Sequence, residues 1–266
     1  MARARPERSG VARVAAAWLA VTIGCALAAD WLPLTDPAQI DLLARGAGPH
    51  AAHWLGTDGL GRDMLARLVH GARTSLAVGL GATLTGLLAG GLLGLAAGYR
   101  RGRLDRAAAI MTDTLLAFPA LLLALTVVAV LGQATATLVL ALGVACIPAF
   151  ARVARAQALS LREREFVEAA RAGGAGEWRI LWRHVLPNAL PSVATFALVV
   201  LAVLIMAEGA LSFLGLGVPP PVPSWGGMIA EGRAYLEDSP HVALLPIAVL
   251  AATVWAVNVV AERLRG

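Results

Sequence analysis

Long apolar runs separated by short polar segments fill almost the whole chain. Six runs are near or above the ~17–25 residues that a helix needs to cross a bilayer. They lie at about residues 14–29, 76–99, 107–131, 134–150, 187–214 and 242–261. The pattern predicts an all-α polytopic membrane protein with six transmembrane helices, in which residues 1–13 precede a single transmembrane domain, residues 14–266.

Composition supports a membrane protein. Hydrophobic residues make up 58% of the chain and charged residues only 15%, whereas a soluble domain has roughly 25% charged residues. The two cysteines, Cys25 and Cys146, stand in apolar runs. Their positions indicate small buried side chains rather than a disulfide framework.

Basic residues are distributed unevenly between the two sides of the predicted bundle. The formal net charge is +5, and every basic residue other than histidine is an arginine. The predicted outer segments contain only Arg45, Arg62, Arg67, Arg73 and Arg233. The other arginines flank the spans on the opposite side, so the positive-inside rule places both termini in the cytoplasm and explains the charge without nucleic acid.

The absence of lysine excludes one kind of chemistry. A Walker A phosphate loop requires a lysine, so this chain cannot bind ATP through that motif. We find no nucleophile elbow or nucleotide fingerprint, and we predict no enzymatic activity. His50 and His53 are three residues apart, but no cysteine or carboxylate completes a ligand set in the sequence around them. We therefore predict no metal site.

One polar segment interrupts the apolar pattern more than any other, at about residues 156–187. Residues 161–172 lack Gly and Pro, which favours a helix. Gly173 and Gly174 should stop that helix, and a second short helix fits residues 177–186. Pro187 suits the first turn of the next span. The prediction is a helical elbow between two spans.

The elbow resembles the EAA loop of permease subunits of binding-protein-dependent ABC importers. The matching residues, at the family's spacing, are Glu168, Ala169, Ala170, Gly174, Leu186 and Pro187. His184 occupies a position where the general pattern has isoleucine. In this departure the elbow is similar to the peptide and nickel branch, in which this position is variable. The resemblance implies that the elbow docks into a cytoplasmic ATPase subunit. The alternative is an ordinary loop between two spans.

A second motif lies in the predicted outer loop, at about residues 30–75. It resembles the signature of second-subunit (C-type) permeases of dipeptide, oligopeptide and nickel importers, and its residues are Gly56, Thr57, Asp58, Gly61, Arg62 and Asp63. We expect Asp58 to cap a helix and residues 63–69 to form a short amphipathic helix. A structural anchor is the favoured role, and contact with the binding protein is the second.

Three features inside the spans need an interpretation. Gly86, Gly90, Gly94 and Gly98 recur every four residues, which predicts close helix packing. For Asp113, a buried polar link between helices or closeness to the membrane boundary is favoured over contact with the substrate or a gate. Glu208 has two equal interpretations, a residue lining the translocation path at the partner interface or a hydrogen bond between helices.

The resemblance covers most of the chain and implies a type I ABC importer permease (MetI-like) fold. It implies a multi-pass bacterial inner membrane permease for peptides or nickel that works with a homologous second permease, two ABC ATPase subunits and an extracytoplasmic binding protein. No cofactor is expected on this chain, because ATP and Mg²⁺ would bind the ATPases. The resemblance also favours a retained first span over a cleaved signal peptide.

Two alternatives remain open. A secondary transporter would depend on an ion gradient without an ATPase, but few charges lie in the predicted spans and no broken helix pair is apparent. A membrane scaffold would bind the ATPases without transporting a substrate.

Overall fold

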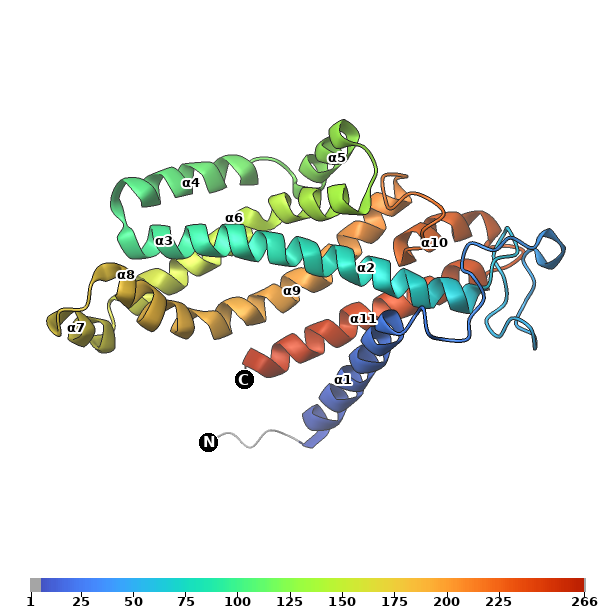
Figure 1. Ribbon diagram of the computed structural model, residues 1–266, viewed down its shortest axis with the longest axis horizontal. Coiled ribbons are helices and arrows are strands. Elements are labelled where there is room, and N and C mark those ends of the chain that lie inside the picture. The colour runs from blue at the N-terminus through green and yellow to red at the C-terminus, as the bar shows by residue number, and fades with distance from the viewer. Residues whose placement is uncertain (1–5, 266) are drawn as a thin grey trace.

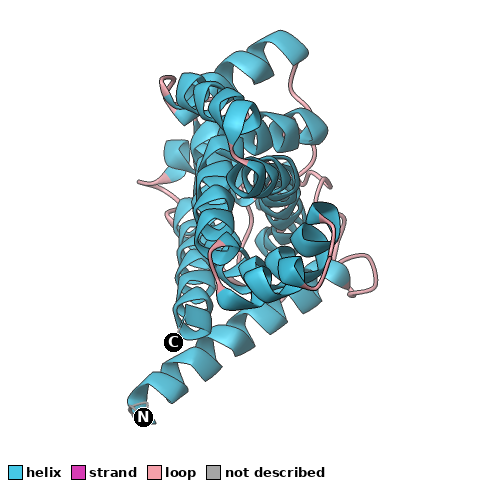
Figure 2. Ribbon diagram, turned by 90° about the vertical axis from the view of Figure 1, so that its left-hand side faces the viewer, coloured by secondary structure: helices cyan, strands magenta, loops and turns pink. Residues whose placement is uncertain are grey.

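The computed structural model describes residues 6–265 as a bundle of long helices (Figures 1 and 2). The first five residues of the predicted N-terminal segment, and Gly266, lie outside this part. The helices longer than one turn are α1 (Pro6–Leu27), α2 (Met64–Gly86), α3 (Leu92–Arg100), α4 (Gly102–Leu116), α5 (Ala120–Leu131), α6 (Thr135–Arg162), α7 (Glu165–Ala172), α8 (Glu177–Ile180), α9 (Leu186–Phe213), α10 (Trp225–Gly232) and α11 (His241–Arg265). Two π-turns, Leu87–Gly91 and Leu181–Val185, join α2 to α3 and α8 to α9, and 3-10 turns lie at Leu42–Ala44 and Arg233–Tyr235.

Five helical segments of the described chain are long and apolar enough to cross a membrane, and a bent pair, α4 with α5, makes a sixth if it counts as one span. The all-helical, polytopic prediction is confirmed. The elbow of α7 and α8 lies at one end of the bundle, and the loop before α2 lies with α10 at the other (Figure 1). We call these the elbow end and the loop end.

The second span differs from its prediction. We expected a short helix at residues 63–69 and a span at 76–99, but one helical segment of 37 residues runs from Met64 to Arg100. Gly71 does not end this helix. The helix packs so closely against α10 here that a Cβ on Gly71 would lie 3.3 Å from the ring of Trp225. At 1.5 Å per residue the segment is about 55 Å long, so its first turns rise above the hydrocarbon core.

The third span is not straight, and the prediction of an unbroken helix at 107–131 was wrong. Its two halves, α4 and α5, meet at an angle of 83°. Pro119 explains the break, because a proline disfavours helical conformation in the residue before it and lacks an N–H for the helical ladder. The expectation that the chain has no broken helix pair fails with it.

The predicted helix at 161–172 is divided as well. α6 runs through Pro148 to Arg162, and α7 begins only at Glu165. No Gly or Pro causes this break. The guanidinium of Arg162 donates to the carbonyl of Tyr99 (2.7 Å), and Val167 on α7 is fully buried at the elbow end. Tertiary packing therefore overrides local helix propensity here.

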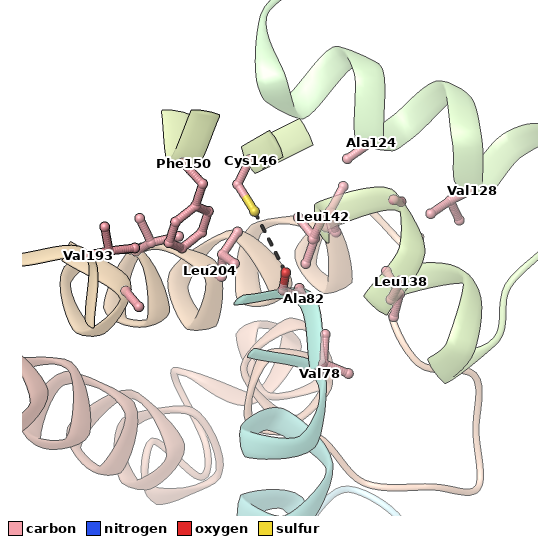
Figure 3. Close-up of a cluster of buried hydrophobic side chains, with 14 of the residues drawn as sticks. Val78, Ala82, Ala124, Val128, Leu138, Leu142, Cys146, Phe150, Val193 and Leu204 are labelled. Atoms are coloured by element: carbon pink, nitrogen blue, oxygen red, sulfur yellow. Dashed lines mark hydrogen bonds between the residues drawn. The ribbon is translucent and has the colours of Figure 1, made fainter. Parts of the chain in front are cut away.

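The glycine periodicity predicts the packing correctly. A Cβ on Gly90, Gly94 or Gly98 would lie 2.1–2.5 Å from a backbone carbonyl oxygen of α6, so only glycine allows this approach. Gly86 faces Cys146 of α6 in the same way. Beside this seam the apolar core joins α2, α5, α6 and α9 (Figure 3). The seam fixes α2 and α3 along α6, which carries the elbow at its end.

Candidate coupling elbow and outer-loop site

The turn of the elbow is a Schellman motif built on Gly174. Gly174 has φ +80°, a left-handed conformation that glycine adopts without strain. Its amide donates to the carbonyl of Arg171 (3.0 Å), and the amide of Ala175 donates to that of Ala170 (3.0 Å). These two bonds satisfy the last carbonyls of α7, as the motif requires. The predicted break at Gly173 and Gly174 is therefore present, and Gly174 determines its shape.

The inner face of the elbow is apolar and packs onto the end of the bundle. Val167 of α7 and Ile180 of α8 are fully buried in a cluster that also contains Leu95 and Tyr99 of α3. Ala170 and Leu186, two of the motif residues, are partly buried against this cluster. Their apolar side chains hold the elbow in place and do not present a free surface.

The outer face of the elbow carries the remaining motif residues. Glu168, Ala169, Gly174 and Pro187 are exposed. Within the described chain the carboxylate of Glu168 makes no hydrogen bond or ion pair, so its charge is available to another molecule. The small side chain of Ala169 next to it allows a second backbone or helix to approach closely. The motif therefore has two parts. Its partly buried residues hold the elbow against the bundle, and its exposed residues, the exposed half of the elbow, can bind another molecule.

A polar brace ties both helices of the elbow to α3. The carboxylate of Glu177 on α8 accepts a hydrogen bond from the hydroxyl of Tyr99 (2.5 Å) and another from Nε of Arg171 on α7 (3.0 Å). The hydrogen bond to Glu177 raises the pKa of Arg171. No sequence motif marks Tyr99 or Glu177 as part of this site. The only signal in the sequence is that one of the two tyrosines of the chain stands at the end of a predicted span. This position does not identify the partner of its hydroxyl group.

At the loop end, glycines shape the second motif. Gly56 and Gly61 have φ +78° and +77°. A Cβ on Gly61 would overlap the carbonyl oxygen of Asp41, and a Cβ on Gly56 would lie 2.6 Å from that of Ala47. The hydroxyl of Thr57 donates to the carbonyl of Ala44 and is fully buried. Both glycines therefore allow the loop to fold back tightly on itself.

Asp58 and Arg62 of the motif form a charged cluster with Arg67 of α2 and Glu231 of α10. Asp58 is 2% exposed and accepts a hydrogen bond from Nε of Arg62 (2.6 Å). Arg62 and Arg67 both donate to Glu231 of α10, at 2.6 and 2.9 Å. Nε of Arg67 lies 3.3 Å from Asp58 without hydrogen-bonding geometry. Asp58, Arg62 and Arg67 are buried and Glu231 closes the cluster at the surface, so two positive and two negative groups neutralise one another, which supports the anchoring role.

The predicted helix cap was assigned to the wrong aspartate. Asp63, not Asp58, caps α2 by accepting from the amide of Ala66 (2.7 Å). Asp58 instead accepts from the amides of Leu60 and Arg62 and closes the turn before it. The sequence gives no signal for Glu231, because its role comes from contacts with Arg67 of α2, 164 positions earlier, and with Arg62 of the loop.

Glu208 is enclosed within this chain. It is 0% exposed, and its carboxylate accepts hydrogen bonds from Ser75 of α2 (3.1 Å) and Ser212 of α9 (2.8 Å). The amide of Trp225 donates to the same Ser75 (3.1 Å), so Glu208 connects α2, α9 and α10. This burial favours the second of the two sequence interpretations, a hydrogen bond between helices. In this conformation the side chain does not reach a surface that a path could use.

Asp113 is linked to another helix as expected, but the link is exposed and not buried. It accepts a hydrogen bond from Arg152 of α6 (2.8 Å), and the two side chains are 65% and 60% exposed. The pair joins α4 to α6 on an open face of the single chain.

Comparison with known proteins agrees with these features. The profile of the family described as "Binding-protein-dependent transport system inner membrane component" matches residues 90–266. The glutathione transport system permease protein GsiD of Pectobacterium atrosepticum is 41% identical over 259 residues, which cover 97% of this chain and 86% of that protein. The protein of the same name from Shigella dysenteriae is 41% identical over 262 residues, covering 98% and 86%.

The fold resembles that of a solved transporter. A chain from an inward-facing structure of the MetNI methionine ABC transporter superposes with a TM-score of 0.61 at 21% identity, covering 76% of this chain and 96% of that one. This confirms the expected MetI-like permease fold. The chain therefore belongs to the family of inner membrane components of binding-protein-dependent transport systems, and it is the multi-pass, non-catalytic permease subunit of an ABC importer.

Proposed function

We propose that this chain is the second permease subunit of an importer for small peptides, and that its elbow is the site where an ATPase subunit docks. The observation that carries the docking site is the exposed half of the elbow. A carboxylate without a partner and a small side chain lie on α7 of an elbow whose inner face is fixed to the bundle by Val167 and Ile180. A fixed, exposed charge beside a small side chain forms a surface that a cleft on another protein can bind.

The proposed mechanism follows from the way the elbow is held. The α8–α9 segment is helical from Glu177 to Phe213, so a push on the elbow moves a helix that crosses the membrane. The brace of Tyr99 and Glu177 transmits the same push to α3. A rigid-body movement of the bundle by closing ATPases, with a homologous second permease beside it, would switch the path between the two sides of the membrane. In this proposal ATP and Mg²⁺ bind the two ATPase subunits and not this chain.

Support for a peptide substrate comes from the relatives. Their name assigns them to transport of glutathione, a peptide. The outer-loop motif in this chain packs into an anchor for α2 and α10, which leaves substrate choice to the extracytoplasmic binding protein. Nickel remains the alternative cargo that the sequence resemblance implies.

Uptake by the reconstituted importer tests the proposal. The chain would be co-expressed with a second permease, the ATPases and the binding protein of the same importer, and vesicles would be supplied with ATP and labelled glutathione, dipeptides or Ni²⁺. We expect ATP-dependent uptake of a peptide. Uptake of Ni²⁺ alone would replace the peptide assignment. Uptake driven by an ion gradient without ATPases, or assembly without any uptake, would support a secondary transporter or a scaffold instead.

A further inference from the structure

Two exposed tryptophans lie on the elbow outside its EAA motif. Trp178 of α8 and Trp182 of the π-turn that follows stand one turn apart, and their rings meet edge to face with centroids 5.4 Å apart. They are 59% and 39% exposed in the single chain. An indole has an apolar body and one N–H donor, so it suits a boundary between hydrocarbon and water. The pair therefore offers a surface to a neighbour that is part apolar and part polar.

Three arginines adjoin this pair without counter-ions. Arg100, the last residue of α3, holds its guanidinium over Trp178, with Cζ 5.7 Å from the ring centroid. Arg179 and Arg183, each next in sequence to one of the tryptophans, are exposed on the neighbouring face of the same helical segment. None of the three arginines forms an ion pair within residues 6–265. Three exposed positive charges beside two rings therefore fit an anionic group.

The second span gives the depth of this group relative to the membrane. Residues 74–99 contain no charged side chain and make about 39 Å of helix at 1.5 Å per residue. The hydrocarbon core is ~30 Å thick, so a core that excludes the arginines at both ends leaves Arg100 no more than about 9 Å beyond its edge. This is the depth of the lipid headgroups, on the side that the arginine distribution assigns to the cytoplasm. Trp178 shares this depth because it contacts Arg100, and Trp182 is one turn nearer to α9.

We propose that these five side chains, named the Trp–Arg surface, bind the headgroup of an anionic phospholipid of the cytoplasmic leaflet. The members of the surface are Arg100, Trp178, Arg179, Trp182 and Arg183. The guanidinium groups donate to the phosphate oxygens, and the rings cover the glycerol and the first carbons of the acyl chains. A soluble subunit approaches the elbow from the aqueous side, where α7 lies farther than α8 from the middle of the bundle (Figure 1). The bound lipid thus holds α8 from the membrane, while the brace of Tyr99 and Glu177 holds it from the bundle.

Quenching of tryptophan fluorescence by brominated lipids tests the proposal. The complete importer would be placed in phosphatidylcholine nanodiscs that contain increasing fractions of either brominated phosphatidylglycerol or equally brominated phosphatidylcholine. The signal of the two rings is the difference between the wild type and a variant with both Trp178→Phe and Trp182→Phe, which keeps an aromatic ring at each position. We expect half-maximal quenching of this signal at an at least tenfold lower fraction of the brominated phosphatidylglycerol.

Arginine variants test the recognition of the headgroup. Arg179→Gln combined with Arg183→Gln should abolish most of the preference for phosphatidylglycerol, since each arginine near an anionic surface contributes roughly fivefold in affinity. Lysines at the same two positions keep the charge and should retain most of the preference. Arg45→Gln is the matched control, because Arg45 is exposed at the loop end with its Cζ 5.9 Å from the ring centroid of Tyr235, and it should leave the preference unchanged.

Three results would overturn the proposal. Equal quenching of the two rings by both brominated lipids would mean that they lie in lipid without recognising a headgroup. Quenching by neither lipid would place them in a protein interface, such as one with an ATPase subunit. An unchanged preference in the double glutamine variant would remove the arginines from the site. The measurement requires neither ATP nor a cargo, so failure of the coupling or peptide assignment would leave it interpretable.

Discussion

The elbow and the outer loop carry the two sequence motifs of this chain, and the charged residues of the two motifs have opposite environments. Both combine glycines with charged residues at fixed spacing, and in both a glycine with positive φ makes the turn. At the loop end the charges of Asp58 and Arg62 are buried and paired. At the elbow end Glu168 is exposed and has no partner in the described chain. A motif of this kind can therefore stabilise a fold or present a binding surface. Whether its charges are paired within the chain distinguishes the two roles.

The largest effect should follow from breaking the charged cluster of the outer loop. Asp58→Ala leaves the buried Arg62 and Arg67 with only the exposed carboxylate of Glu231 between them. Removing one partner of a buried ion pair costs about 3–5 kcal/mol. We expect the amount of inserted protein and the thermal stability of the complex to fall sharply. Asp36→Ala is the control, because Asp36 accepts an amide in the same loop but is exposed.

A charge reversal on the elbow should affect transport and spare the fold. Glu168→Arg changes an exposed side chain, so the variant should insert and melt like the wild type. If Glu168 contacts an ATPase subunit, we expect uptake to fall at least tenfold and co-purification of the ATPase to weaken. Glu237→Arg makes the same change on an exposed residue at the loop end and should retain uptake. Equal uptake by both variants would contradict the contrast between the two ends.

The elbow also has a structural component, which glycine substitutions can measure. Gly174→Ala places a Cβ at φ +80°, which costs about 1–2 kcal/mol. Gly176→Ala is matched, since a Cβ there meets nothing within 4 Å and its φ of −68° suits alanine. We predict a severalfold loss of uptake for the first variant and none for the second. Identical uptake would mean that the shape of the turn does not matter for coupling.

Glu208→Gln should give the smallest effect, because a hydrogen-bonding link between helices survives this substitution. Glu208→Gln keeps the shape of the side chain and can still bond Ser75 and Ser212. We expect uptake within about twofold of the wild type, at both low and high salt, whereas Glu208→Leu leaves buried hydroxyls without their acceptor and should impair assembly. A Gln variant that assembles fully and loses transport would return Glu208 to the path.

Local features of the chain predicted most of the architecture. Apolar runs identified the spans, glycine spacing identified the seam between α3 and α6, and Gly174 identified the elbow. Wrong predictions arose where contacts far apart in sequence decide. Arg162 and Val167 end α6 through tertiary packing. The break at Pro119 is the exception, since it has a local cause that hydropathy alone does not register. Tyr99, Glu177 and Glu231 gain roles only through partners on distant helices, which no local pattern contains.

The central claim is that the exposed half of the elbow meets an ATPase subunit. A photo-reactive benzophenone attached to Ala169→Cys in a Cys25→Ser background tests it directly, because Ala169 is exposed beside Glu168. The same probe on Val222→Cys, which is 49% exposed at the loop end, is the control. We predict that illumination of the assembled importer cross-links the elbow probe to the ATPase and the control probe to no ATPase. An elbow probe that reaches only lipid, in a complex that retains its ATPases, would contradict the account.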